Sequence, residues 1–231
     1  MNLSGKRIVV TGAFGTVGAA VVKYALEAGA KVAAIDYADK APSDQWNGEV
    51  FSLGGVDLSS PEKAEAAFAT ASGKLGGIDG LANIAGGFRW ETVTDGSIDT
   101  WEAMFKINVR TAVVATKSAL PYLLKSSTSA IVNVSAMGAL KADMGLGAYA
   151  ASKAGVAKLT EALAIEQKAN GLRVNAVLPS IIDTAPNRAD MPDADYSAWV
   201  SPQELSNVVL FLLSDAASAV TGGLVPVTGR V

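Results

Sequence analysis

The stretch RIVVTGAFGTVG, residues 7–18, decides the fold of this chain. Its first five residues are mostly apolar and β-branched and predict a buried strand over residues 7–11. Gly12, Gly15 and Gly18 follow in a tight turn that predicts the start of a helix over residues 17–28. Such glycines let the main chain approach a pyrophosphate at the positive end of a helix. The same triplet also fits an ordinary strand-to-helix turn, because 23 of the 231 residues are glycine.

Beyond this turn, short β-branched runs alternate with longer helical stretches to the end of the chain. We expect strands at residues 7–11, 31–36, 49–53, 79–84, 130–135, 173–178 and 224–227. We expect helices at residues 17–28, 61–75, 98–125, 148–170 and 202–213, the third of them bent near Asn108 or Pro121. This order predicts an α/β fold, a doubly wound and mostly parallel sheet of about seven strands with helices on both faces. No linker or repeat interrupts it, so residues 1–231 form a single domain.

Composition excludes several classes of function. The chain has no histidine and no cysteine, which excludes zinc sites built on imidazole or thiolate, histidine-based triads and disulfides. We expect no metal. A net charge of −3 gives no basic surface for nucleic acid. No run of about 18 apolar residues occurs, so we expect no membrane span and a cytoplasmic protein.

Asp36 strengthens the dinucleotide interpretation of the glycine turn. It ends the second predicted strand, where a carboxylate can accept hydrogen bonds from an adenosine ribose diol and repels a 2′-phosphate. This pattern favours NAD(H) over NADP(H). The alternative for Asp36 is a simple turn or cap residue before Tyr37.

A second group of residues indicates acid/base chemistry. Tyr149 and Lys153 are four residues apart, on one face of a predicted helix. A nearby cation stabilises a phenolate, so we expect Lys153 to lower the pKa of Tyr149 and make it a general acid/base. Ser135, at the end of the strand before this helix, is predicted to hold a substrate oxygen beside the phenol. In isolation the YxxxK spacing also fits a surface pair.

Taken together, these motifs resemble the short-chain dehydrogenase/reductase family, which has an NAD(P)-binding Rossmann fold, over essentially the whole chain. The matching segments are TGAFGTVG at 11–18, Asp36, Asp57-Leu58, Asn83 to Gly86, Asn108, Ser135, YAASK at 149–153, RVNAVLP at 173–179 and residues 182–184.

The resemblance implies a role for each matched residue. Near the adenosine half of NAD it implies Gly12, Gly15 and Gly18 at the pyrophosphate, Asp36 at the ribose, and Asp57 and Leu58 at the adenine. Along the rest of the cofactor it implies Asn83, Ala85, Gly86, Tyr149, Lys153 and the stretch Pro179, Ile182 and Thr184. The implied catalytic residues are Tyr149 as acid/base, Lys153 in its support, Ser135 on the substrate oxygen and Asn108 supporting a water.

The chain departs from the common family pattern after Thr184. Only 16 residues separate Thr184 from Ser201, so the usual two-helix substrate lid is reduced to a short segment at about 185–200. This segment resembles the matching part of quinonoid dihydropteridine reductase, an NADH-using branch of the family. That branch typically lacks the family's asparagine and serine, whereas Asn108 and Ser135 are present here.

Three functions are therefore carried forward. The first is an NAD(H)-dependent oxidoreductase moving hydride between nicotinamide and a secondary alcohol or ketone, which the retained Asn108 and Ser135 favour. The second is a dihydropteridine-reductase-like enzyme, and the third is a non-catalytic dinucleotide-binding regulator.

We expect a small-molecule substrate and a homodimer or homotetramer, since the family pairs the helices matching 98–125 and 148–170. Five side chains either form a substrate wall or pack a loop: Phe88, Trp90, Met191, Tyr196 and Trp199.

Overall fold

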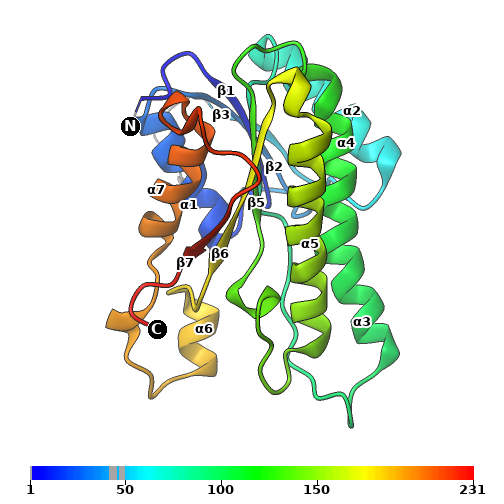
Figure 1. Ribbon diagram of the computed structural model, residues 1–231, viewed down its shortest axis with the longest axis vertical. Coiled ribbons are helices and arrows are strands. Elements are labelled where there is room, and N and C mark those ends of the chain that lie inside the picture. Colours follow the sequence, from blue (N-terminus) through cyan, green and yellow to red (C-terminus); the bar gives the residue numbers. More distant parts are fainter. Residues whose placement is uncertain (1, 42–45, 47–49) are drawn as a thin grey trace.

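A computed structural model describes residues 2–41, 46 and 50–231, and shows one seven-stranded parallel sheet between two layers of helices (Figure 1). The strands are β1 (Arg7–Thr11), β2 (Lys31–Ile35), β3 (Val50–Leu53), β4 (Gly80–Asn83), β5 (Ala130–Val134), β6 (Arg173–Pro179) and β7 (Leu224–Val227). Their order in the sheet is β3-β2-β1-β4-β5-β6-β7. The predicted fold class is confirmed. Glu49, the first residue expected in the third strand, lies outside the described residues.

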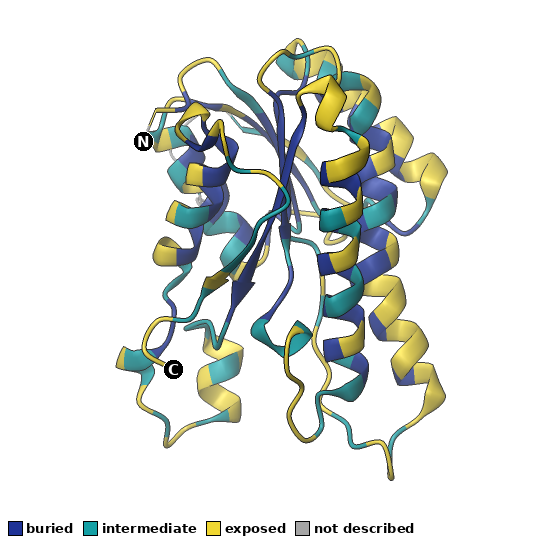
Figure 2. Ribbon diagram, in the orientation of Figure 1, coloured by how far each residue is buried: buried dark blue, intermediate teal, exposed yellow. Residues whose placement is uncertain are grey.

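The helices cover both faces of the sheet, which explains why the strands are apolar on both sides. They are α1 (Thr16–Glu27), α2 (Pro61–Leu75), α3 (Ile98–Met104), α4 (Thr111–Leu123), α5 (Gly147–Glu166), α6 (Ala185–Asp190) and α7 (Pro202–Leu213). α1 and α7 share one buried apolar cluster with the sheet, and α2, α4 and α5 share another. Figure 2 shows the strands as the most buried layer between these helices.

The long helix expected over residues 98–125 is interrupted where we predicted a bend. A π-helical segment, Phe105–Arg110, separates α3 from α4 and contains Asn108. Pro121 lies inside α4 without ending it. π-helical turns are frequent at functional sites because they re-aim a side chain within a helix. The segment brings Asn108, which is 1% exposed, against the loop after β4.

The other differences from the predicted elements are small. Predicted ends differ by at most four residues, and α6 is a short helix that the sequence pattern did not predict. Short 3₁₀ turns occur at Met137–Ala139, Lys168–Asn170, Tyr196–Ala198 and Asp215–Ala217. Among the described residues, no helix is both long and apolar enough to span a membrane.

The strand order fixes where a ligand site can form. β1 pairs with β2 on one side and with β4 on the other, so the direction of chain progression reverses at β1. In such sheets a crevice opens at the carboxyl ends of the strands at this reversal point. The glycine turn follows β1, and the segments carrying most other predicted site residues follow β2, β4, β5 and β6.

Candidate active site

The turn after β1 is closely packed at two of its three glycines. Gly12 has a φ of +62°, and a side chain there would lie 2.7 Å from the Ala85 Cα. At Gly18 a side chain would lie 2.7 Å from the Ala13 Cα. Gly15, the residue before α1, is different: a Cβ there would meet only the Gly12 carbonyl, at 3.6 Å. Gly12 and Gly18 therefore permit close packing, while Gly15 leaves the N-terminal end of α1 open to a ligand.

Asp36 follows β2 and is held by the main chain on both of its carboxylate oxygens. Phe14 N donates to Oδ2 at 2.8 Å, and Ala38 N donates to Oδ1 at 2.9 Å. A carboxylate can accept about four hydrogen bonds, so both oxygens keep acceptor capacity for a ribose diol. The bond to Phe14 ties Asp36 to the glycine turn, and the two features together fit a dinucleotide with an unphosphorylated ribose.

Asp57 and Leu58, predicted at the adenine, lie just before α2. Asp57 accepts hydrogen bonds from the main-chain N–H and the hydroxyl of Ser59, and these bonds hold its pKa below the usual range. Leu58 is 5% exposed and packs in the core. Their contact with adenine stays a prediction.

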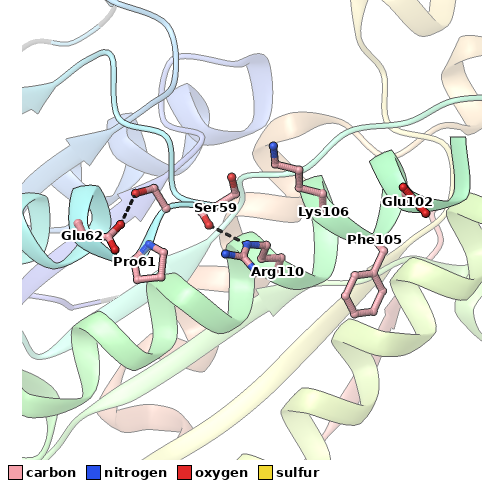
Figure 3. Close-up of a pocket in the computed structure, with 8 residues that line it drawn as sticks. Ser59, Pro61, Glu62, Glu102, Phe105, Lys106 and Arg110 are labelled. Carbon is pink, nitrogen blue, oxygen red and sulfur yellow. Dashed lines mark hydrogen bonds between the residues drawn. The ribbon is translucent and has the colours of Figure 1, made fainter. Parts of the chain in front are cut away.

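A cavity of about 700 Å³ opens next to these residues, between the start of α2 and residues 102–110 (Figure 3). Ser59 lines it together with Glu62, Phe105 and Lys106, and its carbonyl accepts a hydrogen bond from Arg110 at 2.8 Å. None of its lining residues is a predicted site residue, and Tyr149 does not line it.

Tyr149 and Lys153 lie in the first two turns of α5, as the sequence predicts. The Lys153 ammonium lies 5.8 Å from the centroid of the Tyr149 ring and donates to the Val134 carbonyl at 2.9 Å. A Cβ at Gly86 would lie 3.3 Å from this ammonium. The structure therefore brings Lys153, Tyr149, the end of β5 and the loop after β4 together.

The environment of this pair shifts both pKa values through burial. Burial raises the pKa of Tyr149 to about 12 and lowers the pKa of Lys153 to about 8. The expectation that Lys153 lowers the pKa of Tyr149 is therefore wrong for the free protein. The physical reason is burial of the phenol, whose ring packs at 83° to that of Phe88 with the ring centroids 4.9 Å apart, while the Lys153 ammonium donates to the Val134 carbonyl.

Asn108 binds the loop after β4 to helix α5. Its amide exchanges two hydrogen bonds with the main chain of Gly87, each 3.0 Å long. Its Nδ2 also donates to the Ser152 hydroxyl at 3.0 Å, and that hydroxyl donates to the Tyr149 carbonyl at 2.7 Å. Asn108 thus holds Gly87 close to the turn of α5 that carries Tyr149. Ser152 is not among the residues predicted from the sequence, although its place inside the YAASK motif is a signal for it.

Ser135 lies directly after β5 and is buried. It is 1% exposed, and its hydroxyl donates to the main-chain carbonyl of Lys153 at 2.8 Å. Its own N–H donates to the Val177 carbonyl on β6. The single hydroxyl proton is therefore used inside the protein, and a contact of Ser135 with a substrate oxygen stays a prediction.

Asn83 is also directed into the protein. Its side-chain amide donates to Thr116 at 3.2 Å and to Asn133 at 3.0 Å, and Asn133 donates in turn to Thr160 at 2.9 Å. This buried polar network joins β4, β5, α4 and α5 beneath the site. Any contact of Asn83 with a cofactor would come from its main chain. Ala85 continues from there, and its N–H donates to the Thr11 hydroxyl at 3.2 Å.

The segment after β6 forms a small cap in place of a two-helix lid. Pro179 ends β6, and Ile182 pairs with Val200 in an isolated bridge. Thr184 begins α6 and accepts a hydrogen bond from Asn187 N on its hydroxyl at 3.4 Å. This bond is long, so the Thr184 hydroxyl retains capacity for a ligand.

Four of the five side chains considered as a substrate wall separate into two groups, and the fifth, Met191, is half-buried directly after α6. The Tyr196 and Trp199 rings are tilted at 57° to each other, with centroids 4.8 Å apart, and Trp199 is buried. These two pack the cap. Phe88 and Trp90 are each 54% exposed, and Trp90 donates its indole N–H to the Met144 carbonyl at 3.1 Å. Trp90 thereby connects the loop after β4 to the loop before α5.

Comparison with known proteins decides the family. A family model described as short chain dehydrogenase matches residues 6–195. This chain belongs to the short-chain dehydrogenase family. The resemblance inferred from the sequence motifs is confirmed, and the fold matches that of a solved short-chain dehydrogenase structure.

Relatives match this short-chain dehydrogenase over nearly its full length. 2-(S)-hydroxypropyl-CoM dehydrogenase 3 of Xanthobacter autotrophicus is 30% identical over 247 residues, covering 99% of this chain and 97% of that protein. Meso-2,3-butanediol dehydrogenase of Serratia marcescens is 32% identical over 241 residues, covering 99% and 95%. Carveol dehydrogenase from Mycobacterium avium, solved in complex with NAD, superposes with a TM-score of 0.88 at 26% identity, covering 99% and 98%.

Proposed function

We propose that this protein is an NAD(H)-dependent dehydrogenase/reductase that interconverts a secondary alcohol and a ketone, with Tyr149 as general acid/base. The observation that carries the proposal is the convergence of Tyr149, Lys153 and Gly86 at the carboxyl ends of β4 and β5, on the sheet that also carries the glycine turn. The alcohol dehydrogenases among its relatives support the substrate class.

Asp36 supports NAD(H) as the cofactor. Its two oxygens, each fixed by a main-chain N–H, keep acceptor capacity for a ribose diol, and their charge would repel a 2′-phosphate. Gly15 leaves room for the pyrophosphate at the start of α1. When bound, the nicotinamide would supply or accept the hydride.

In the reductive direction, Tyr149 would donate a proton to the substrate oxygen. Negative charge develops on the carbonyl oxygen as its carbon is reduced, and the phenol hydroxyl would hydrogen-bond that oxygen and then transfer its proton. With a pKa of about 12, the phenol is protonated at neutral pH and ready for this step. In the oxidative direction the same group must first lose its proton, so oxidation should increase with rising pH.

Lys153 and Asn108 would support this step in different ways. The Lys153 ammonium, with a pKa of about 8, is mostly protonated at neutral pH and would hold the ribose next to the nicotinamide. Asn108 keeps Gly87, and with it the loop carrying Gly86 and Phe88, against α5. The water that the family resemblance assigns to Asn108 is part of the proposal.

The variant Tyr149→Phe tests the acid/base assignment. Removing the hydroxyl should lower turnover by about 10²- to 10⁴-fold, because general acid/base catalysis contributes about that much. The Kd for NADH should stay within about twofold. Tyr24→Phe, on the opposite face of the sheet in α1, is the matched control and should keep the wild-type rate. A Tyr149→Phe rate near that of the wild type would contradict the proposal.

A second candidate, reduction of a quinonoid dihydropterin-like ring, is favoured by the short cap. The cap over residues 185–200 is short, with only α6 and one 3₁₀ turn. Ser135 directs its hydroxyl to the Lys153 carbonyl, so its presence does not distinguish a carbonyl reductase from a pterin reductase. Turnover of a quinonoid dihydropterin without turnover of any ketone would favour this candidate.

We also propose a homodimer or homotetramer in the cytoplasm. Six small or apolar residues of α4 and α5 are buried within one chain: Ala112, Ala115, Ala119, Ala157, Leu163 and Ala164. The exposed apolar side chains of this region include Trp101, Phe105, Ile107 and Ile165. Pairing through these helices would therefore use the exposed side chains.

A further inference from the structure

Two consecutive residues at the end of β5 hold Lys153 at both of its ends. The Val134 carbonyl accepts a hydrogen bond from the Lys153 ammonium at 2.9 Å. The Ser135 hydroxyl donates to the main-chain carbonyl of Lys153 at 2.8 Å. Ser135 is 1% exposed and Lys153 is 5% exposed, so neither bond is shared with bulk solvent. A serine hydroxyl has one proton, and here it is used on the main chain of α5.

We propose that Ser135 is a positioning residue for Lys153 and does not contact the substrate. The inference rests on the proposed function, in which Lys153 holds the cofactor and supports Tyr149. The Ser135 hydroxyl fixes the main chain of Lys153 against β5, and the neighbouring Val134 carbonyl fixes its ammonium. Because Tyr149 lies one helical turn earlier, the same bond fixes the height of the phenol along the sheet. The phenol is then the group that holds the substrate oxygen.

The space around the ammonium explains why its position matters. A Cβ at Gly86 would lie 3.3 Å from the Lys153 Nζ and 2.6 Å from the Asn108 Oδ1. The ammonium is therefore enclosed by the end of β5, the loop after β4 and the π-helical segment. A displacement of Lys153 would change the surface that the cofactor is expected to contact, before any substrate binds.

The fold should survive loss of the Ser135 hydroxyl. The Lys153 carbonyl lies inside α5, where the N–H four residues later also supplies a donor in a regular helix. Removing Ser135 Oγ therefore leaves no unpaired buried carbonyl. We expect Ser135→Ala to lower Tm by only about 2 to 4 °C in a chain of this size.

The test compares Ser135→Ala with Ser206→Ala. Ser206 is also buried, and its hydroxyl donates to the Pro202 carbonyl at 2.7 Å in α7, on the other face of the sheet. NADH affinity is measured by fluorescence titration without substrate, and KM and kcat are measured with a ketone that the wild type reduces. We expect Ser135→Ala to weaken NADH binding about threefold to tenfold. The substrate KM should stay within about twofold of the wild-type value, and kcat should fall by less than about tenfold. Ser206→Ala should leave NADH affinity unchanged.

A double-mutant cycle with Lys153→Met gives a second measurement. If Ser135 acts through Lys153, adding Ser135→Ala to Lys153→Met should not weaken NADH binding further. Ser135→Cys keeps a weak donor of similar size, so its NADH affinity should lie between those of the wild type and Ser135→Ala. It replaces Ser135→Ala in the cycle if that variant does not fold.

Two results would overturn the inference. One is unchanged NADH affinity in Ser135→Ala with kcat/KM lower by about 10²- to 10³-fold, which is the loss expected for a donor to the substrate oxygen. The other is a fully additive effect of Ser135→Ala and Lys153→Met on NADH affinity. Failure of the wild type to bind NADH or NADPH is a different result, because it would contradict the proposed function itself.

Discussion

Replacing Lys153 by methionine should stabilise the protein at neutral pH while it impairs the proposed activity. Lys153 is 5% exposed, and burial lowers the pKa of its ammonium from 10.5 to about 8. Below about pH 8 the folded protein therefore keeps a buried charge that the unfolded chain carries in water. One pKa unit corresponds to about 1.4 kcal/mol, so this burial costs about 3 kcal/mol at pH 7.

Methionine fills similar space without a charge, but it loses one hydrogen bond. The bond from the Lys153 ammonium to the Val134 carbonyl contributes about 1 kcal/mol. The net gain for Lys153→Met is therefore about 2 kcal/mol at pH 7. In a chain of this size, that gain corresponds to an increase in Tm of about 4 to 8 °C.

The pH dependence of this gain follows from the direction of the pKa change. Between about pH 8 and pH 10.5 the unfolded lysine keeps its proton while the folded one has lost it, so the wild type gains stability as the pH rises. The advantage of Lys153→Met should shrink over the same range. The raised pKa of Tyr149 destabilises the fold above about pH 10, but this affects both proteins and cancels in their difference.

Urea unfolding of wild type and variant between pH 7 and pH 10 measures the difference directly. Lys158→Met is the matched control, because Lys158 is in the same helix with a side chain 76% exposed and pairs with Glu161 at the surface. Lys158→Met should show no gain in stability that depends on pH. If Lys153→Met is no more stable than wild type at pH 7, or if its gain is the same at pH 7 and pH 10, the reasoning about the buried ammonium is wrong.

Two further predictions concern the cofactor and the assembly. Asp36→Ala should lower the preference for NADH over NADPH by about tenfold, because it removes the charge that repels a 2′-phosphate. Fluorescence titrations measure the two Kd values, and an unchanged ratio between them would show that Asp36 does not select the cofactor. Light scattering at micromolar concentration should give the mass of a dimer or tetramer, and a monomer mass would contradict the proposed assembly.

The sequence predicts the fold well because its signals are local. The β-branched run before Gly12 and the helical stretches that end at glycines define most elements within a few residues. The sequence also predicts a bend near Asn108 or Pro121, and the structure has a π-helical segment that contains Asn108. The short helix α6 was not predicted, since its six residues follow a proline-containing turn and carry too few apolar positions for a helical period.

The side-chain contacts of the site depend on how distant elements pack, which one sequence does not show. Ser135 directly follows β5, but only the docking of α5 places the Lys153 carbonyl beside its hydroxyl. The raised pKa of Tyr149 depends on burial beneath Phe88, 61 positions earlier in the chain. Asn83 faces inward because Thr116 and Asn133 provide partners there. Spacing therefore predicted which residues meet, and packing decided what each one does.

The most direct test of the account is NADH oxidation by the wild type against two substrate panels. One panel holds ketones and aldehydes, and the other holds chemically generated quinonoid dihydropterin. We predict oxidation of NADH with at least one carbonyl substrate, reduced by Tyr149→Phe. Turnover of the pterin alone would contradict the alcohol/ketone assignment in favour of the second candidate. NADH binding without turnover of either panel would contradict an enzymatic role and indicate a dinucleotide-binding regulator.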